Sequence, residues 1–555
     1  MKRPSAVTCA RRLKCCTDAN TVGCRNLVTR RTISAVAIVI IVAAAIVTAY
    51  WVTRPSPPPK EMVGVYGYTT SDVVMSWDPS DAFSNEIVVM QNIYEPLVRY
   101  DSKADKFIPV LATSWESSAD GLVWTFHLRQ GVKFHTGNEF DANAVRYSIN
   151  RTITRGQGAA WIWSSVQEVK VVDKYTVQFI LQYAAPLTSV AASSYAAYIL
   201  DPKAIEEGGA DFFAQANEVG TGPYMLERYS KAEDMVVLKK FPDYWGGWEG
   251  KHFDKVIIKA VPESATARQL LEAGEVDILD DLPYEDVAAL KTKPGIEIVT
   301  TGSFQNLLAF FNTQRPPLDN KLVRTAVSYS FPYEQVLRDV MSGYATQARG
   351  PIPKGMWAYS EEVPQYTYDL QKAKQLLTEA GYPTGGLSLT LTYNSGDENE
   401  RKTAELWKSE AAKIGIDLAI RGMTWEQQWD MAKSPTPEAR QDIFMMYWWP
   451  DIAGDPYSFV YNMFHSEKEP VFAMSYYNNT RFDGLIDEAF TISGVDRARA
   501  KQMYVEAEKI LVEDAVAVFI YDQQYVRIKR TSLMGYVDNP TYPHVVFFYY
   551  TYRQE

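Results

Sequence analysis

The sequence predicts an α/β fold of two or more lobes, preceded by one membrane-spanning helix. The first observation is length, because 555 residues exceed the roughly 250 to 300 that one hydrophobic core supports. The second is an alternation of strand-like and helix-like segments from Met62 onward, without tandem repeats, which favours layered α/β lobes. The third is a single long apolar run near the start. The composition, 46% apolar and 22% charged, excludes a disordered chain and a protein with many membrane spans.

The apolar run spans residues 33–52 and contains no charged residue. Its 20 residues, at about 1.5 Å each, suffice to cross a hydrocarbon layer of about 30 Å. Arg25, Arg30 and Arg31 lie just before the run. Because basic flanks stay in the cytoplasm, we predict a single-pass anchor with everything after Val52 outside the cell membrane.

A cleaved export signal is the alternative interpretation of the same run, because Val47 and Ala49 offer a small-x-small cleavage site. No cysteine follows the run, so a lipid-modified cysteine is not expected to tether the outer domain. The spacing of the cysteines within residues 1–32 does not match a zinc site, and we predict free cytosolic thiols. The four are Cys9, Cys15, Cys16 and Cys24.

The charge of the chain changes at the apolar run. Residues 1–32, predicted to be cytoplasmic, carry +7, whereas the whole chain carries −11, so the remainder carries −18. This acidity disfavours binding to nucleic acid or anionic lipid, since either needs a basic face. Residues 53–60 include the run RPSPPPK and are predicted to form a semi-rigid linker.

Local patterns predict individual elements of the outer domain. Alternating apolar residues over 122–128 predict a strand, and Gly131 is expected to turn it into a hairpin with 132–134. Asp141 is suited to cap the helix that follows.

The second half of the outer domain repeats a helix-then-strand order. Asp369 is expected to cap one helix. Another helix, closed at Gly415, leads into a strand over 416–420, as in a crossover unit. A helical stripe over 503–511 likewise precedes a strand over 516–521.

The common sequence signals of catalysis do not occur. No two of the five histidines stand at i,i+3 or i,i+4, where one helix could offer both to a metal. The hydrolase, nucleotide and dinucleotide motifs are also absent. Glycoside hydrolysis needs two carboxyls about 5 to 9 Å apart, and the adjacent pairs Asp280–Asp281 and Glu361–Glu362 are predicted to be solvated surface. We therefore predict a binding protein with no enzymatic activity, metal or cofactor.

Residues 109–151, PVLATSWESSADGLVWTFHLRQGVKFHTGNEFDANAVRYSINR, closely resemble the signature region of the family 5 extracellular solute-binding proteins, the peptide and oligopeptide class. Further matching segments follow in order: GTGPYMLERY (220–229), FPDYWGGWEG (241–250), FNTQRPPLDNKLVRTAVSYS (311–330), LLTEAGYP (376–383) and YWWPDIAGDPYSF (447–459). The resemblance covers the chain from Met62 to the C-terminus.

This resemblance implies a two-lobed periplasmic-binding-protein fold of type II, the large peptide-binder class. Lobe I is expected over 61–300, lobe II over 301–520 and a return to lobe I over 521–555, with crossings near Thr300 and Tyr521. It also implies the function of a substrate-binding subunit of an ABC importer. Peptides would be captured between the hinged lobes and delivered to a membrane permease, with a separate ATPase supplying the energy.

The resemblance implies that a carboxylate binds the terminal ammonium of the peptide by a charge-assisted hydrogen bond. Asp451 occupies the matching place after a tryptophan-containing segment. The relatives usually place proline four residues after that aspartate, whereas Pro456 follows Asp451 by five. Asp455 is therefore a second candidate, with capping of the helix that begins near Tyr457 as its structural alternative.

Five further residues are expected to line the ligand site. The resemblance assigns backbone hydrogen bonds with the peptide to Phe83, Ser84 and Asn85, in the manner of strand addition. Trp425 matches a position in the side-chain pocket. Trp448 and Trp449 flank Asp451, where their rings could cover apolar side chains or stack on sugars; core packing is the alternative for each tryptophan.

Three other functions remain open. The same fold could bind an oligosaccharide or another solute, since 13% of the residues are aromatic. A tethered sensory protein is a second alternative, and a membrane-anchored hydrolase is a third. Loss of peptide binding in an Asp451→Ala variant that still binds neutral sugars would separate the first two ligand classes.

Overall fold

The computed structural model divides the chain into two units, residues 1–60 and 61–555. It describes residues 41–44, 61–101, 103–466, 472–542 and 544–554. In the first unit only residues 41–44 are described, and they are helical. Among the described residues, no helix combines the length and apolarity needed to span a membrane. The rest of the predicted anchor, the segment 1–32 with its cysteines and the linker 53–60 lie outside the described residues.

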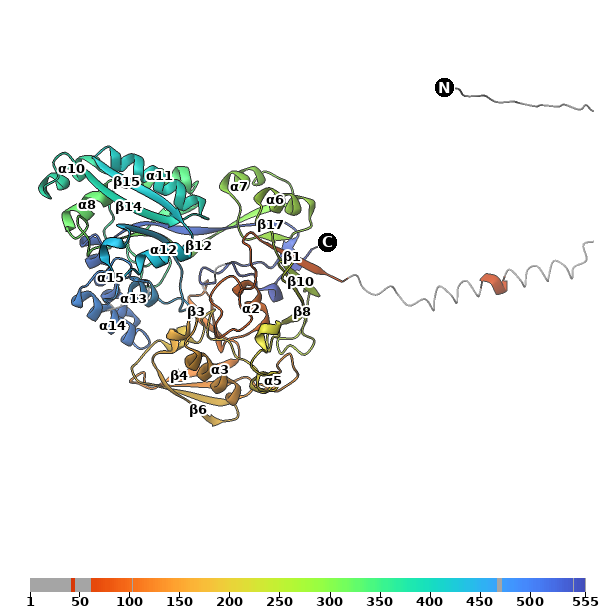
Figure 1. Ribbon diagram of the computed structural model, residues 1–555. Coiled ribbons are helices and arrows are strands. Elements are labelled where there is room, and N and C mark those ends of the chain that lie inside the picture. Colours follow the sequence, from red (N-terminus) through yellow and green to blue (C-terminus); the bar gives the residue numbers. More distant parts are fainter. Residues whose placement is uncertain (1–40, 45–60, 102, 467–471, 543, 555) are drawn as a thin grey trace, which may run out of the picture. The chain divides into compact units, whose positions relative to one another are not determined.

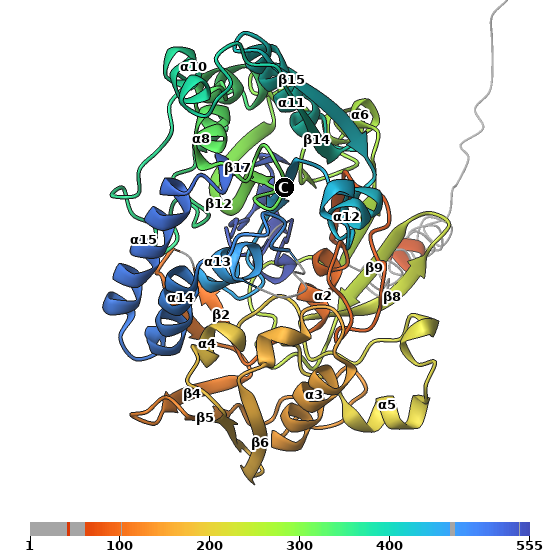
Figure 2. The same ribbon diagram turned by 60° about the vertical axis from the view of Figure 1, so that its left-hand side comes forward.

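The second unit is built on one long mixed sheet (Figure 1). Its strands, in spatial order, are β15 (Ile416–Met423), β14 (Leu387–Asn394), β16 (Ile443–Trp448), β12 (Ile296–Phe311), β17 (Ala517–Arg530), β11 (Ile278–Leu279), β1 (Val63–Tyr68), β10 (Lys255–Ala260), β9 (Met235–Lys240) and β8 (Tyr224–Ser230), with β13 (Ala345–Gln347) paired to β17. The helices α8, α10 and α11 lie at one end of the unit and a smaller sheet lies at the other (Figures 1 and 2).

Two long strands, β12 and β17, run antiparallel through the middle of this sheet. Thr300 pairs with Val526 and Leu307 pairs with Tyr521, and the register shifts between Gly302 and Asn306. The two predicted crossings, near Thr300 and Tyr521, therefore fall in the two paired central strands of the sheet. The lobe boundaries themselves stay a prediction.

The helices predicted from capping residues form where expected. The Asp141 carboxylate accepts hydrogen bonds from the N–H groups of residues 143 and 144 at the start of α3 (Ala142–Arg155). The Asp369 side chain caps α10 (Leu370–Glu379) in the same way. These predictions are confirmed because a cap depends on only four or five neighbouring residues.

The predicted crossover unit is also confirmed. Strand β14, helix α11 (Glu398–Ala412) and strand β15 follow one another, and the two strands pair in parallel. Helix α15 (Arg497–Glu513) likewise precedes β17.

The smaller sheet corrects the predicted hairpin. It contains β4 (Ala112–Ser117), β5 (Val123–Leu128), β7 (Thr176–Leu181) and β6 (Val166–Asp173), in that order. Gly131 does turn the chain, with φ of 75°, but the neighbours of β5 are β4 and β7. Lys133 forms only an isolated bridge with Glu139. The prediction of a hairpin with 132–134 was wrong, because β7, a strand some 50 residues later in the sequence, pairs with β5 instead.

The other elements are short strands and helices that surround the two sheets. They are β2 (Val98–Asp101), β3 (Lys106–Pro109), β18 (Leu533–Met534), β19 (Tyr552–Arg553), α2 (Ile87–Ile93), α4 (Leu187–Val190), α5 (Pro202–Gly208), α6 (Ser264–Ala273), α7 (Tyr284–Leu290), α8 (Lys321–Tyr329), α9 (Tyr333–Gln335), α12 (Trp425–Ala432), α13 (Tyr457–Phe464), α14 (Thr480–Ser493) and five helical turns (Ala160–Trp163, Phe213–Gln215, Val336–Val340, Pro437–Ala439, Phe548–Tyr550).

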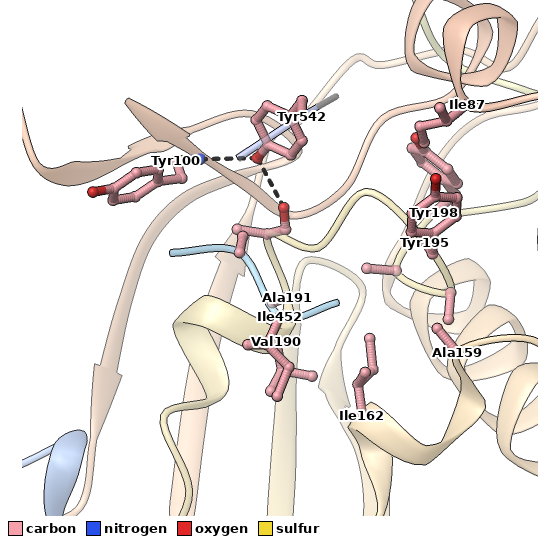
Figure 3. Packing of buried hydrophobic residues seen from close by; sticks show 14 of the residues in the cluster. Ile87, Tyr100, Ala159, Ile162, Val190, Ala191, Tyr195, Tyr198, Ile452 and Tyr542 are labelled. Carbon is pink, nitrogen blue, oxygen red and sulfur yellow. Dashed lines mark hydrogen bonds between the residues drawn. The ribbon is translucent and has the colours of Figure 1, made fainter. Parts of the chain in front are cut away.

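The largest hydrophobic core joins segments that are far apart in sequence. Figure 3 shows Tyr542, near the C-terminus, between the early strand β2 and the segment after α4. The Tyr542 hydroxyl accepts a hydrogen bond from the Tyr100 N–H at 3.2 Å and donates one to the Ala192 carbonyl at 2.9 Å. Ile452, from the loop after β16, is fully buried and belongs to the same core as Val190. The loop that carries Asp451 therefore packs against the first half of the chain.

Buried charges near β17 correct one surface prediction. Asp281 is exposed as predicted. Asp280 is buried rather than solvated, and its carboxylate accepts hydrogen bonds from the Thr69 N–H and hydroxyl at 2.8 and 2.9 Å. Arg527 is also buried; it donates to the Asp280 carbonyl at 2.8 Å and to the Asp538 carboxylate at 3.2 Å. The pair Glu361–Glu362 is exposed as predicted.

Candidate functional site

A cavity of about 450 Å³ lies where three parallel strands end. Strand β14 pairs in parallel with both β15 and β16, so the segments that follow these strands meet at one edge of the sheet. Two residues from the first half of the chain complete the wall. The lining residues are Phe83, Ser84, Gln305, Asn394, Asp397, Glu400, Trp425, Trp429, Met446, Tyr447, Trp448, Trp449, Asp451 and Phe472.

The cavity brings together six of the eight residues predicted for the ligand site, and Asn85 and Asp455 are not among its lining residues. The six come from three separate segments, around Phe83, Trp425 and Asp451. Because these segments lie far apart in the sequence, the tertiary fold brings the six residues together. Whether they bind ligand stays a prediction.

Asp451 presents a buried carboxylate to the cavity. Its residue surface is 2% exposed, and its Oδ2 accepts a hydrogen bond from the Asn462 side-chain amide at 2.9 Å. No ion pair to Asp451 occurs among the described residues. Burial raises its pKa to about 7, against the opposing effect of the Asn462 hydrogen bond. The charged form of Asp451 is therefore costly until a cation approaches it.

The contacts of Asp455 differ from those of Asp451. Its carboxylate accepts a hydrogen bond from the Tyr457 N–H at 2.9 Å, at the first residue of α13. Burial raises the pKa of Asp455 to about 6. This contact is the one expected from the helix-capping alternative, whereas a ligand role for Asp455 stays an untested prediction.

The segment at Phe83 does not offer a free strand edge. The N–H groups of Phe83 and Ser84 donate to the Glu86 carboxylate at 2.7 and 2.9 Å. The Asn85 side chain is also occupied, because it donates to the carbonyls of Ser71 and Asp72. These two N–H groups are therefore bound within the protein, and the predicted backbone pairing of this segment with a peptide stays a prediction. Phe83 and Ser84 contribute surface to the cavity instead.

Aromatic rings form a continuous arc along the cavity. The distance between ring centroids is 5.3 Å for Trp425 and Trp429, 4.7 Å for Trp429 and Phe472, and 4.8 Å for Phe472 and Trp448. Trp425 is 42% exposed and begins α12, where Thr424 and Gln427 form a capping box. Sequence reasoning missed Trp429 and Phe472; the signal for Trp429 was its position one helical turn after Trp425.

The cavity also holds two carboxylates that sequence reasoning missed, Asp397 and Glu400. The Asp397 carboxylate accepts from the Glu400 N–H at 2.8 Å and so caps α11. Burial, with the nearby charge of Asp397, raises the pKa of Glu400 well above its ordinary value. No lysine, arginine or histidine is among the described lining residues. The cavity is therefore aromatic and acidic, a combination suited to a ligand with positive charge.

The two-lobed fold with a cavity lined from both halves of the chain defines a solute-binding protein. The chain belongs to the bacterial extracellular solute-binding proteins, family 5, whose model matches residues 106–470. This is a family of solute-binding proteins rather than enzymes.

Individual relatives cover most of the chain. It is 32% identical over 468 residues to a probable D,D-dipeptide-binding periplasmic protein of Escherichia coli (strain K12), covering 82% of this chain and 88% of the relative. It is 30% identical to heme-binding protein A of Haemophilus influenzae, covering 81% and 85%. Among solved structures, a periplasmic binding protein of Helicobacter pylori in complex with the peptide STSA has 27% identity and a TM-score of 0.76, covering 89% of this chain and 99% of that one.

Proposed function

We propose that this chain is the extracytoplasmic substrate-binding subunit of an ABC importer that captures di- to oligopeptides and delivers them to a permease driven by a separate ATPase. The observation that carries the proposal is the buried Asp451 carboxylate, which lines an aromatic cavity and has no cationic partner among the described residues. The free amino terminus of a peptide supplies that cation. The family and the peptide-bound Helicobacter pylori relative support the same ligand class.

In this proposal the eight predicted residues divide by task. Asp451 binds the terminal ammonium, while Trp425, Trp448 and Trp449 cover ligand side chains. Phe83 and Ser84 close the cavity from lobe I. Asn85 and Asp455, which are not among the lining residues of the cavity, remain candidates for ligand contacts, and helix capping is the alternative for Asp455.

Peptide binding should raise the melting temperature of the full-length chain. A ligand that binds only the folded state at 100 times its Kd adds about 2.7 kcal/mol to the free energy of unfolding. We expect stabilisation by Ala-Ala-Ala and none by N-acetyl-Ala-Ala-Ala at the same concentration, measured by differential scanning fluorimetry. Equal stabilisation by both peptides would remove Asp451 as the ammonium site. Stabilisation by maltotriose alone would favour the oligosaccharide alternative.

The proposed arrangement of the chain includes a membrane anchor over residues 33–52, a linker over 53–60, lobe I over 61–300 with the return over 521–555, and lobe II over 301–520. The apolar run and its basic flank support this anchor. We expect the full-length chain to remain in the membrane pellet after carbonate extraction and a variant lacking residues 1–60 to appear in the soluble fraction. Recovery of a full-length chain from the soluble fraction, or an intact mass lacking the first 49 residues, would contradict the anchor.

A further inference from the structure

The cavity contains more carboxyl groups than one peptide amino terminus can bind. Three carboxylates line it, those of Asp397, Glu400 and Asp451, and no described lining residue is basic. In the proposed function, one ammonium group pairs with Asp451. Two carboxylates then remain beside the ligand.

Glu400 is the better placed of these two to contact a ligand. It is 3% exposed and lies in the first turn of α11, directly after the end of β14. Its Oε2 accepts a hydrogen bond from the Asn394 N–H at 2.7 Å, and within the described residues its Oε1 has no hydrogen-bond partner and the side chain no ion pair. A buried carboxylate with one neutral donor is incompletely compensated, and a cationic donor would satisfy its second oxygen.

The surroundings of Glu400 have two further features of a ligand site. The Trp448 indole Nε1 is buried without a hydrogen-bond partner in the described part of the chain, and its ring lines the same cavity. This donor suits a ligand carbonyl oxygen. The Trp425 ring, which is 42% exposed and lines the cavity, favours an adjacent ammonium or guanidinium by cation–π attraction, whereas the Trp429 ring already has the Lys433 ammonium 5.5 Å from its centroid.

The helix cap is the structural role that competes with ligand binding. Asp397 caps α11 through the Glu400 N–H, and Glu400 ties the end of β14 to this helix through the Asn394 N–H. Each of these contacts uses one oxygen of a carboxylate. A neutral amide would serve both contacts equally well, so the structural role does not explain why two acidic side chains line the cavity.

We propose that Glu400, assisted by Asp397, binds the cationic side chain of a lysine or arginine near the amino terminus of the peptide held by Asp451. This inference rests on the proposed function. Glu400 and Asp451 follow the neighbouring parallel strands β14 and β16, and neighbouring strands lie about 4.8 Å apart. Because both residues also line one cavity, we place the second cation near the amino terminus of the ligand. The substrate class is thus a basic peptide rather than any short peptide.

The experiment compares peptides that differ only in this charge. Isothermal titration calorimetry of the full-length chain at pH 7.5 is run with Lys-Ala-Ala against norleucine-Ala-Ala and with Ala-Lys-Ala against Ala-norleucine-Ala. Norleucine keeps the length of the lysine side chain without its ammonium. We expect at least one lysine peptide to bind tenfold or more tightly than its norleucine partner, the gain typical of a charge-assisted hydrogen bond.

Variants then assign the preference to a residue. Glu400→Gln keeps an acceptor for the Asn394 N–H and should reduce the lysine preference to less than threefold. Asp397→Asn keeps the helix cap and should reduce the preference partially. Glu405→Gln, which removes an exposed carboxylate of the same helix, should leave it unchanged. Asp451→Asn should weaken both peptides of a pair by a similar factor.

Different results would overturn the role of Glu400 and the peptide-binding function. Equal binding of lysine and norleucine peptides, or a preference that survives Glu400→Gln, would overturn the role of Glu400 while peptide binding stands. Absence of heat with all four peptides would overturn the peptide proposal itself. A circular-dichroism melting curve of each variant confirms that the comparison is made on folded protein.

Discussion

Asp451→Asn is expected to weaken the binding of a tripeptide with a free amino terminus at least 100-fold at pH 7.5, measured by calorimetry on the full-length chain. Removing one partner of a buried ion pair costs about 3 kcal/mol or more, and asparagine offers only a neutral acceptor. The Asn462 amide can still donate to the new side chain, so the loop should keep its shape. Asp430→Asn, at an exposed position of α12, is the matched control and should bind within twofold of wild type.

The same variant is expected to remove a pH dependence of binding. The pKa of Asp451 is raised to about 7 by burial, while an ammonium ligand binds the charged carboxylate and lowers that pKa. Binding below pH 7 therefore releases a proton, and wild-type affinity should fall about tenfold per pH unit from 7 downward. Above about pH 8 the α-amino group of the ligand deprotonates, which also weakens binding. A wild-type affinity that is flat between pH 5 and 7 would contradict this role for Asp451.

The empty protein should respond to Asp451→Asn in the opposite direction. The folded-state pKa of Asp451 lies above the ordinary value, so its contribution to stability is complete below about pH 4 and is lost as the pH rises through 7. At pH 8 we expect the empty variant to melt at a higher temperature than wild type, and the difference should shrink toward pH 5. Gain of stability with loss of binding is characteristic of a residue kept for its ligand.

Asp538→Asn is expected to lower the free energy of unfolding by about 3 to 5 kcal/mol, because it removes the carboxylate that forms an ion pair with the buried Arg527 guanidinium. The side chains of Arg527 and Asp538 are 4% and 0% exposed. Arg527 lies on β17, one of the two long strands in the middle of the sheet, so the loss should affect the whole unit. The measurement is the urea midpoint of the empty full-length chain, followed by tryptophan fluorescence.

An exposed ion pair provides the control for this second prediction. Glu506→Gln removes the partner of Arg481, and the two side chains are 47% and 71% exposed. Surface pairs contribute about 0 to 1 kcal/mol, so its midpoint should hardly move. Equal effects of Asp538→Asn and Glu506→Gln would show that the buried pair contributes no more than a surface one.

Helix ends and the crossover unit could be predicted from the sequence because they depend on neighbouring residues. Asp141 and Asp369 cap the helices that follow them, and β14, α11 and β15 follow the predicted order. The site aspartate and its flanking tryptophans came from the family resemblance rather than from any local pattern. Pro456 could not distinguish Asp451 from Asp455, whereas the structure shows that one lines the cavity and the other contacts the Tyr457 N–H.

By itself, the sequence determined the α/β class, the capped helices and the family, since each depends on local periodicity or on an ordered series of motifs. The tertiary structure decided which residues share a surface. In the folded protein Asp280 is buried and β5 pairs with β7. Glu400 lies in the same cavity as Asp451, which follows it by some 50 residues in the sequence. Parallel strand pairing brings the ends of β14, β15 and β16 together, and no pattern within one segment carries that information.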